Sequence, residues 1–303
     1  MSLPFVGSEI LSKLLSMVDA IDVLEKAFGS PLPTTPDRSH LAVGTGDLLV
    51  MPAWGAISAG VKLVSVAPGN PAVGLPLIQG VYVLFEKPSL TPVALFDAAS
   101  LTALRTAAVS GVATRRLAKE DAADLVVFGA GVQARAHLEA MVAVRPISRV
   151  RIVSRSPGPA DALVDAASRM GLEARIGSAE SVTQADIICT CTTSSEPVFD
   201  GNFLRPGAHI NAVGSFTRQA RELDDVAAGR ARWIVDTSAA MAESGDLLAP
   251  IGKRIVRTED VEVLSWVVAE GRGRVSDAEI TVFKSVGAAF EDLVIAEAAA
   301  SKL

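Results

Sequence analysis

The stretch Leu125-Val126-Val127-Phe128-Gly129-Ala130-Gly131-Val132-Gln133-Ala134 decides the fold of this chain. Four apolar residues lead into a glycine turn, and residues 132–144 then have the pattern of a helix. Gly129 permits a tight turn, Gly131 lets a phosphate approach the backbone, and Ala134 allows close packing of helix on strand. The free N–H groups at the start of the helix favour a pyrophosphate. We therefore predict a dinucleotide-binding unit with contacts from Gly129, Ala130, Gly131, Val132, Gln133 and Ala134. A plain strand–turn–helix connection is the alternative.

The next expected strand, residues 150–153, bears on the choice of dinucleotide. Enzymes that use NAD carry an acidic residue at the end of this strand, where it binds the ribose 2′-OH. Here the strand runs into Ser154-Arg155-Ser156, without a carboxylate. Because an arginine can pair with a 2′-phosphate, we predict NADPH as the cofactor, contacted by these three residues, with NADH as the alternative. The other interpretation of Arg155 is an ordinary surface arginine.

Composition limits the function classes. The chain has 303 residues, enough for two domains, and it is 50% hydrophobic with a net charge of −6. The acidic balance and the lack of a basic run argue against a nucleic-acid partner. No apolar run reaches the roughly 18 residues that span a bilayer, and the start does not resemble a signal peptide, so we expect no membrane partner and a cytoplasmic location. Cys189 and Cys191 are poorly spaced for a disulfide, and the sequence predicts no metal site.

The order of the expected elements indicates two domains. The first begins with a helix whose apolar residues run from Ile10 to Phe28, followed by a hairpin over residues 38–51 and strands over 60–66, 78–85 and 91–97. A helix over 101–117, capped by Ser100, leads into strands at 125–128, 150–153, 174–176, 187–190, 209–212 and 233–235, with helical stretches between several of them. Residues 277–300 again have the pattern of a helix.

This alternation predicts an α/β chain. The expected fold is a Rossmann-type doubly wound parallel sheet over residues 117–276, which binds NADP. It is joined to a mixed α+β domain over residues 1–116, to which residues 277–303 return. We assign substrate binding and dimerisation to that mixed domain.

Several patches together resemble the ornithine cyclodeaminase/mu-crystallin family. They include Leu101-Thr102-Ala103-Leu104-Arg105-Thr106-Ala107-Ala108 and Glu243-Ser244-Gly245-Asp246, with further matches at residues 60–65, 68–71, 129–134, 211–215, 221–224 and 283–287. The family contains ornithine and lysine cyclodeaminases, an archaeal alanine dehydrogenase and reductases of cyclic ketimines. The resemblance implies a homodimer formed through the first domain. It also implies cofactor contacts from Thr106, Thr192, Val213, Ser215 and Ser285, although hydroxyl residues at strand ends are common without any ligand.

By family position, Arg38, Lys62 and Arg105 are the expected catalytic residues at the substrate. A bidentate arginine is well suited to the carboxylate of a small amino or imino acid. Lys62 lies in an apolar strand, where an ammonium needs a partner or a chemical task, such as proton transfer at the substrate nitrogen. The alternatives are that Lys62 extends to the surface and that Arg105 forms a salt bridge at a helix end.

One position departs from the cyclodeaminases. They carry an aspartate two residues after the glycine that matches Gly214, and this chain has Phe216 there. Phenylalanine cannot accept a proton, so ring closure of ornithine is disfavoured unless another acid, such as Glu222 or Asp224, replaces it. Mu-crystallin-like and pyrroline-carboxylate reductase members also lack the aspartate.

The resemblance thus implies an NAD(P)H-dependent oxidoreductase that reduces Δ1-pyrroline-2-carboxylate to L-proline, with Δ1-piperideine-2-carboxylate to L-pipecolate as the alternative ring size. The other candidates are an ornithine cyclodeaminase, an alanine dehydrogenase, and a non-catalytic cofactor-binding protein of the crystallin kind.

Overall fold

The computed structural model describes residues 3–303, and the chain forms two compact units. The first unit consists of the residues up to Arg105 together with Ala288–Leu303, and the second is Thr106–Gly287. The boundaries between the units therefore lie at 105/106 and 287/288. The sequence predicts domain boundaries at 116/117 and 276/277. Within residues 3–303, no helix is long and apolar enough to cross a membrane.

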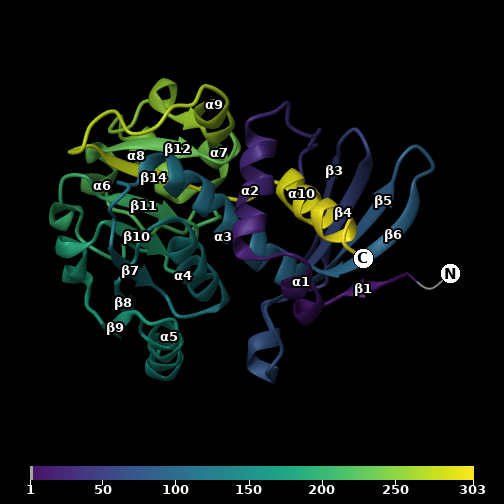
Figure 1. The fold of residues 1–303 in the computed structure, drawn as a ribbon, viewed down its shortest axis with the longest axis horizontal. Helices are drawn as coiled ribbons and strands as arrows, with labels where there is room; N and C mark the ends of the chain where they lie inside the picture. The colour runs from purple at the N-terminus through teal and green to yellow at the C-terminus, as the bar shows by residue number, and fades with distance from the viewer. Residues whose placement is uncertain (1–2) are drawn as a thin grey trace. The chain divides into compact units, whose positions relative to one another are not determined.

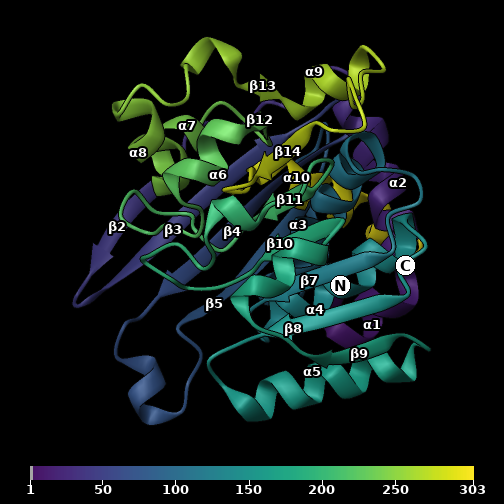
Figure 2. The same cartoon turned by 90° about the vertical axis from the view of Figure 1, so that its left-hand side faces the viewer.

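The second unit contains an eight-stranded sheet in the order β13-β12-β14-β11-β10-β7-β8-β9 (Figure 2), and every strand pair in it is parallel. Each strand predicted in this part of the chain is present. Runs of buried apolar residues are typical of central parallel strands, whereas β9, at the edge of the sheet, is mostly exposed. The strands are β7 (Asp124–Phe128), β8 (Arg149–Val153), β9 (Glu173–Ile176), β10 (Ile187–Thr190), β11 (His209–Ala212), β12 (Ala231–Val235), β13 (Glu262–Val263) and β14 (Ile280–Lys284).

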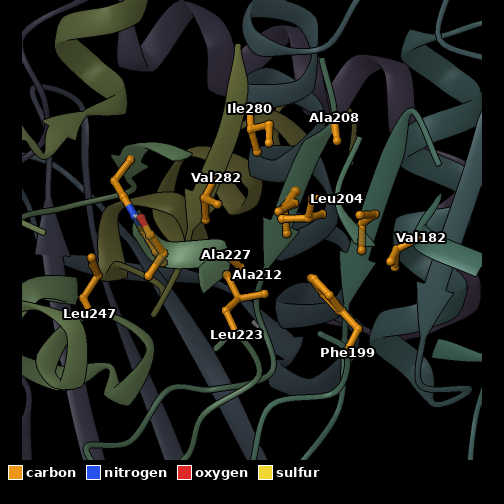
Figure 3. Close-up of a cluster of buried hydrophobic side chains, with 14 of the residues drawn as sticks. Val182, Phe199, Leu204, Ala208, Ala212, Leu223, Ala227, Leu247, Ile280 and Val282 are labelled. Carbon is orange, nitrogen blue, oxygen red and sulfur yellow. Dashed lines mark hydrogen bonds between the residues drawn. The ribbon is translucent and has the colours of Figure 1, made fainter. Parts of the chain in front are cut away.

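Both faces of this sheet are covered, as the doubly wound fold requires. On one face, Asn211 of β11 donates to the hydroxyl of Thr114 in α3 at 3.0 Å and lies near Met141 of α4. On the other face, an apolar cluster joins strands to helices and loops, with Ile280, Val282, Ala227 and Leu247 among its members (Figure 3). The helices are α3 (Ala98–Leu117), α4 (Val132–Val144), α5 (Pro157–Arg169), α6 (Asp225–Arg230), α7 (Ala240–Glu243), α8 (Gly245–Gly252) and α9 (Leu264–Ala269).

The prediction of a helix from residue 277 is wrong in its first part. Residues Ile280–Lys284 form β14, which pairs with β11 and β12 inside the sheet. The run Ile-Thr-Val-Phe is rich in β-branched and aromatic residues, which favour strands. Gly287, at φ +81°, ends this stretch, and the helix α10 (Ala289–Ala300) begins only afterwards.

The first unit contains a six-stranded sheet in the order β1-β6-β5-β4-β3-β2, antiparallel except for β1 beside β6. Helix α10 contacts β3, β4 and β5 on one face of this sheet (Figure 1). It also packs against α2, where the ring centroids of Phe28 and Phe290 are 5.3 Å apart. The elements are β1 (Phe5–Val6), α1 (Ser8–Leu14), α2 (Met17–Phe28), β2 (Ser39–Val43), β3 (Gly46–Trp54), β4 (Ser58–Val66), β5 (Ile78–Glu86) and β6 (Thr91–Asp97).

Two local predictions in this unit are wrong. The first helix is broken into α1 and α2, because Ser16 starts a new helix with a capping box to Asp19. Helix α3 is capped by Asp97 and not by Ser100, since α3 begins at Ala98 and the Asp97 carboxylate accepts the Ser100 N–H at 2.8 Å.

Candidate functional site

The glycine turn after β7 has the geometry that the sequence predicts. Gly129 has φ +100°, and a Cβ there would lie 2.5 Å from the carbonyl oxygen of Cys191. Its N–H donates to the carbonyl of Val153 at 2.8 Å, which fixes the turn between the ends of β7 and β8. Ala134 is fully buried in α4. The turn therefore requires glycine at residue 129 and a small residue at residue 134.

Gly131 differs from Gly129 in that its surroundings are open. A Cβ at Gly131 would meet no atom within 4 Å, and Gly131 is the N-cap of α4 without a side chain to occupy the helix end. The neighbouring Val132 is 69% exposed. A helix N-terminus that is open to solvent and bordered by a glycine fits a diphosphate.

The position of this turn in the sheet supports the same interpretation. The chain proceeds from β7 to β8 and β9 on one side, and then β10 returns to the other side of β7. This reversal is a topological switch point, and ligands of open α/β sheets bind outside the carboxyl ends of the strands there. The residues of the turn lie at that point.

At the end of β8, the side chain of Arg155 is exposed and Ser154 accepts the N–H of Ser156 at 3.2 Å. The three residues follow the strand next to the glycine turn, where the adenosine ribose of a dinucleotide lies in this fold. An exposed arginine at this place suits a 2′-phosphate.

Three of the hydroxyl groups expected to contact the cofactor are hydrogen-bonded inside the protein. Thr192 donates from its hydroxyl to Glu222 at 2.7 Å, and Ser285 donates to Asp236 at 2.8 Å. Ser215 donates its hydroxyl to the carbonyl of Ala220 at 2.5 Å. These residues, with the buried Val213, lie just beyond the carboxyl ends of β10, β11 and β14. Their hydroxyls hold loops in place at these strand ends, and cofactor contact stays a prediction.

Glu222 is the centre of these loops. Its carboxylate is fully buried and accepts the hydroxyls of Thr190 and Thr192, together with the N–H groups of Thr192, Gly214 and Ser215, at 2.7–3.2 Å. Burial raises the pKa of Glu222. With every contact directed to its own loops, Glu222 serves the architecture of the strand ends.

A buried ion pair, Asp246 with Lys284, fixes the backbone at Glu222. Asp246 accepts the N–H groups of Glu222 and Leu223 at 2.7 and 2.9 Å, and Lys284 donates to Asp246 at 3.1 Å. Asp246 and Lys284 were not predicted to form a pair, because they are 38 residues apart in the sequence. The available signal was a lysine at the end of a strongly apolar run.

Asp224 also has a structural task. It is the N-cap of α6, accepting the N–H of Ala227 at 2.7 Å, and its second oxygen accepts the N–H of Gly201 at 2.9 Å. Phe216, in contrast, is 49% exposed on the loop after β11. Glu222 and Asp224, the two acids that could replace the missing aspartate, are therefore not available to a substrate unless their present hydrogen bonds break.

In the first unit, Lys62 lies on the covered face of the sheet. It is only 3% exposed, and its ammonium donates to Asp292 of α10 at 2.7 Å and to Thr102 of α3 at 3.3 Å. Extension of Lys62 to the surface is therefore wrong. Burial lowers the pKa of Lys62, and Asp292 offsets part of that fall.

Arg105 lies beside Lys62 in a buried salt bridge. Its Nη1 is 2.7 Å from Glu291 Oε2, and its Nε is 3.5 Å from Asp292 Oδ1. Both carboxylates are fully buried and come from α10, far along the chain. These partners were not predicted from the sequence, although two adjacent acids in a largely apolar helix were a signal.

Arg38 and Thr106 are the remaining predicted residues. In the sheet, Ser39 lies opposite Val50, and Met51 lies opposite Lys62. Arg38, one residue before β2, therefore continues the row of neighbours across the strands that contains Met51 and Lys62. Arg38 is half-buried. Thr106, in α3, is 7% exposed, and its hydroxyl has no hydrogen-bond partner among residues 3–303.

Comparisons with known proteins agree with this arrangement. The profile of the ornithine cyclodeaminase/mu-crystallin family matches residues 7–302. A Δ1-pyrroline-2-carboxylate reductase of Bacillus cereus is 37% identical over 299 residues, which cover 94% of this chain and 92% of that protein. An alanine dehydrogenase of Archaeoglobus fulgidus is 32% identical, covering 95% and 91%. The structure of a Thermococcus litoralis Δ1-pyrroline-2-carboxylate reductase in complex with NADH and L-proline matches with a TM-score of 0.92 and 34% identity, covering 99% of this chain and 97% of the other. The chain therefore belongs to the ornithine cyclodeaminase/mu-crystallin family.

Proposed function

We propose that this protein is an oxidoreductase that reduces a cyclic ketimine, Δ1-pyrroline-2-carboxylate, to L-proline with NADPH. The observation that carries the proposal is the buried pair of cations, Lys62 and Arg105, on the covered face of the first sheet. Each cation is held by a buried acid of α10, and a guanidinium and an ammonium fixed side by side suit the carboxylate of an imino acid. The relatives named as reductases of this imine support the choice of substrate.

In the proposed reaction, bound NADPH supplies a hydride to C2 of the imine. Arg105, with Arg38, binds the substrate carboxylate and orients C2. The electron pair of the C=N bond moves to the ring nitrogen. A protonated imine keeps the proton that it already carries, whereas a neutral imine takes one proton from the Lys62 ammonium, which is left as a neutral amine. Phe216 provides no acid for ring closure of ornithine, which favours reduction of a preformed ring.

NADPH is proposed in place of NADH because of Arg155. The relatives with known structures include complexes with NADH and with NAD+. In this chain, the exposed Arg155 and the absence of an acid from Ser154-Arg155-Ser156 favour a 2′-phosphate.

We also propose a homodimer formed by the first unit. The sheet face opposite α10 carries Val61, Leu63, Val81, Val83 and Leu95, all half-buried and apolar. A row of aliphatic side chains on a sheet face is typical of an interface, and an archaeal alanine dehydrogenase that matches with a TM-score of 0.92 is a dimer. Light scattering on the purified protein tests this, and a monomer at micromolar concentration would contradict it.

The decisive test is turnover. Purified protein is mixed with Δ1-pyrroline-2-carboxylate and NADPH, with NADH in a parallel reaction, and with L-ornithine and NAD+ in a third. Rapid loss of NADPH absorbance with formation of L-proline is expected. Lys62→Ala should lose most of its kcat/KM, whereas the exposed Lys13→Ala should keep it. Release of ammonia from ornithine without imine reduction would reject the proposed function in favour of a cyclodeaminase.

A further inference from the structure

Two adjacent acids of α10, Glu291 and Asp292, have no solvent exposure and face the proposed substrate cations. Asp292 Oδ2 is 2.7 Å from Lys62 Nζ, and Glu291 Oε2 is 2.7 Å from Arg105 Nη1. Both acids lie in the first turn of α10, where the helix dipole stabilises negative charge. The two acids therefore balance the two cations in a buried region.

We propose that Asp292 is a positioning residue that keeps Lys62 protonated and directs its ammonium, so that this acid sets the alkaline limit of the reaction. Glu291 performs the corresponding task for Arg105 by fixing the guanidinium. This inference rests on the proposed function and adds to it the residues that control the charge of the substrate site.

The groups around Lys62 determine its charge. From α10, Asp292 and Glu291 favour the ammonium, and from α3, Arg105 opposes it while Thr102 accepts a hydrogen bond. From β5, Tyr82 lies directly opposite Lys62 in the sheet. Burial raises the pKa of Tyr82 well above its usual range, so it stays a neutral phenol. From β3, Met51 carries no charge.

The balance of these effects depends on Asp292. Burial lowers the pKa of Lys62 and Arg105 lowers it further, so the ammonium is maintained mainly by the carboxylate at 2.7 Å. Removing an opposite charge at such a distance typically shifts a pKa by about one to three units. Without Asp292, Lys62 would therefore lose its proton closer to neutral pH.

The test begins with a titration that needs no turnover. The protein is labelled with 13C at the lysine ε-carbons, the Lys62 signal is assigned by its loss in Lys62→Met, and its midpoint is measured by NMR. Asp292→Asn, which keeps the shape and removes the charge, should lower the midpoint by about one to three pH units. Asp292→Glu should restore most of it. Glu297→Gln is the matched control, since this acid lies on the same helix but contacts Ser58.

The second readout is the pH profile of kcat/KM with Δ1-pyrroline-2-carboxylate, whose alkaline limb should move with the Lys62 midpoint. If the wild type does not reduce this imine, the proposed function fails, and the titration still decides the inference. If Asp292→Asn does not fold, Glu291→Gln replaces it, with a smaller downward shift expected. A Lys62 midpoint that is the same in the wild type and in every folded variant of these two acids would overturn the proposal.

Discussion

Replacing Glu222 with glutamine tests whether this buried carboxylate holds the loops at the ends of β10 and β11. The carboxylate accepts three backbone N–H groups, one at Oε1 from Thr192 and two at Oε2 from Gly214 and Ser215. A glutamine has only one acceptor oxygen. In either orientation of the amide, its NH2 group faces at least one of these backbone N–H groups. Two donors then face each other, because a backbone N–H cannot accept a hydrogen bond, whereas a hydroxyl could rotate and accept one.

The cost follows from this count. In the better orientation, the NH2 group occupies the Oε1 position and one buried N–H, that of Thr192, loses its partner, at about 1–3 kcal/mol. The remaining hydrogen bonds lose the assistance of the charge, which brings the expected loss to about 2–4 kcal/mol. For a unit of this size, that corresponds to a fall in Tm of roughly 5–10 °C. The displaced loops should also weaken cofactor binding about tenfold, or 1.4 kcal/mol.

The assay is thermal unfolding by circular dichroism, together with titration of NADPH followed by fluorescence. Glu196→Gln is the matched control, because this side chain is exposed near the same loop and should change neither quantity. A Glu222→Gln protein that unfolds within about one degree of the wild type and binds NADPH equally well would show that the hydrogen bonds of Glu222 do not support the loops as reasoned.

Three further outcomes are expected. Gly131→Val should leave Tm unchanged, because a Cβ there meets no atom within 4 Å, but it should weaken NADPH binding on the order of 100-fold. Gly158→Val on α5 is the control and should not change NADPH binding. Equal affinities of Gly131→Val and the wild type by calorimetry would refute the proposed phosphate site. Arg155→Ser should weaken NADPH at least about tenfold and NADH little, and a uniform loss would show that Arg155 does not contact a 2′-phosphate. Burial lowers the pKa of His137 from 6.5 to about 4 and that of His209 to about 3. The unfolded state therefore binds more protons than the folded state below pH 6.5, and stability should fall as the pH drops from there towards 4, by about 3 kcal/mol for His137. A Tm that stays constant across this range would contradict the neutral, buried state of these histidines.

The sequence by itself determined the parallel sheet and its glycine turn. Strands such as β7 are short, continuous apolar runs, and Gly129 meets a requirement of backbone geometry that extends over only a few residues. Local patterns of this kind depend on sterics and burial within one element, so they can be predicted without knowing what lies beside it. The orientation of Lys62 stayed open at the level of sequence, because its neighbours Val61 and Leu63 are both apolar, and the structure places it on the covered face of the sheet.

Only the tertiary structure decided the partners of the charged groups. Lys62 and Arg105 meet Asp292 and Glu291 across separations of 230 and 186 residues. The insertion of β14 between β11 and β12 likewise depends on which strand edges are open when the chain returns to the sheet. A run of five residues carries no information about its neighbours in space, and the cost of a buried charge is offset only by a group that the fold brings to it. The types of the site residues could therefore be predicted from the sequence, while their pairing and protonation depended on the assembled first unit.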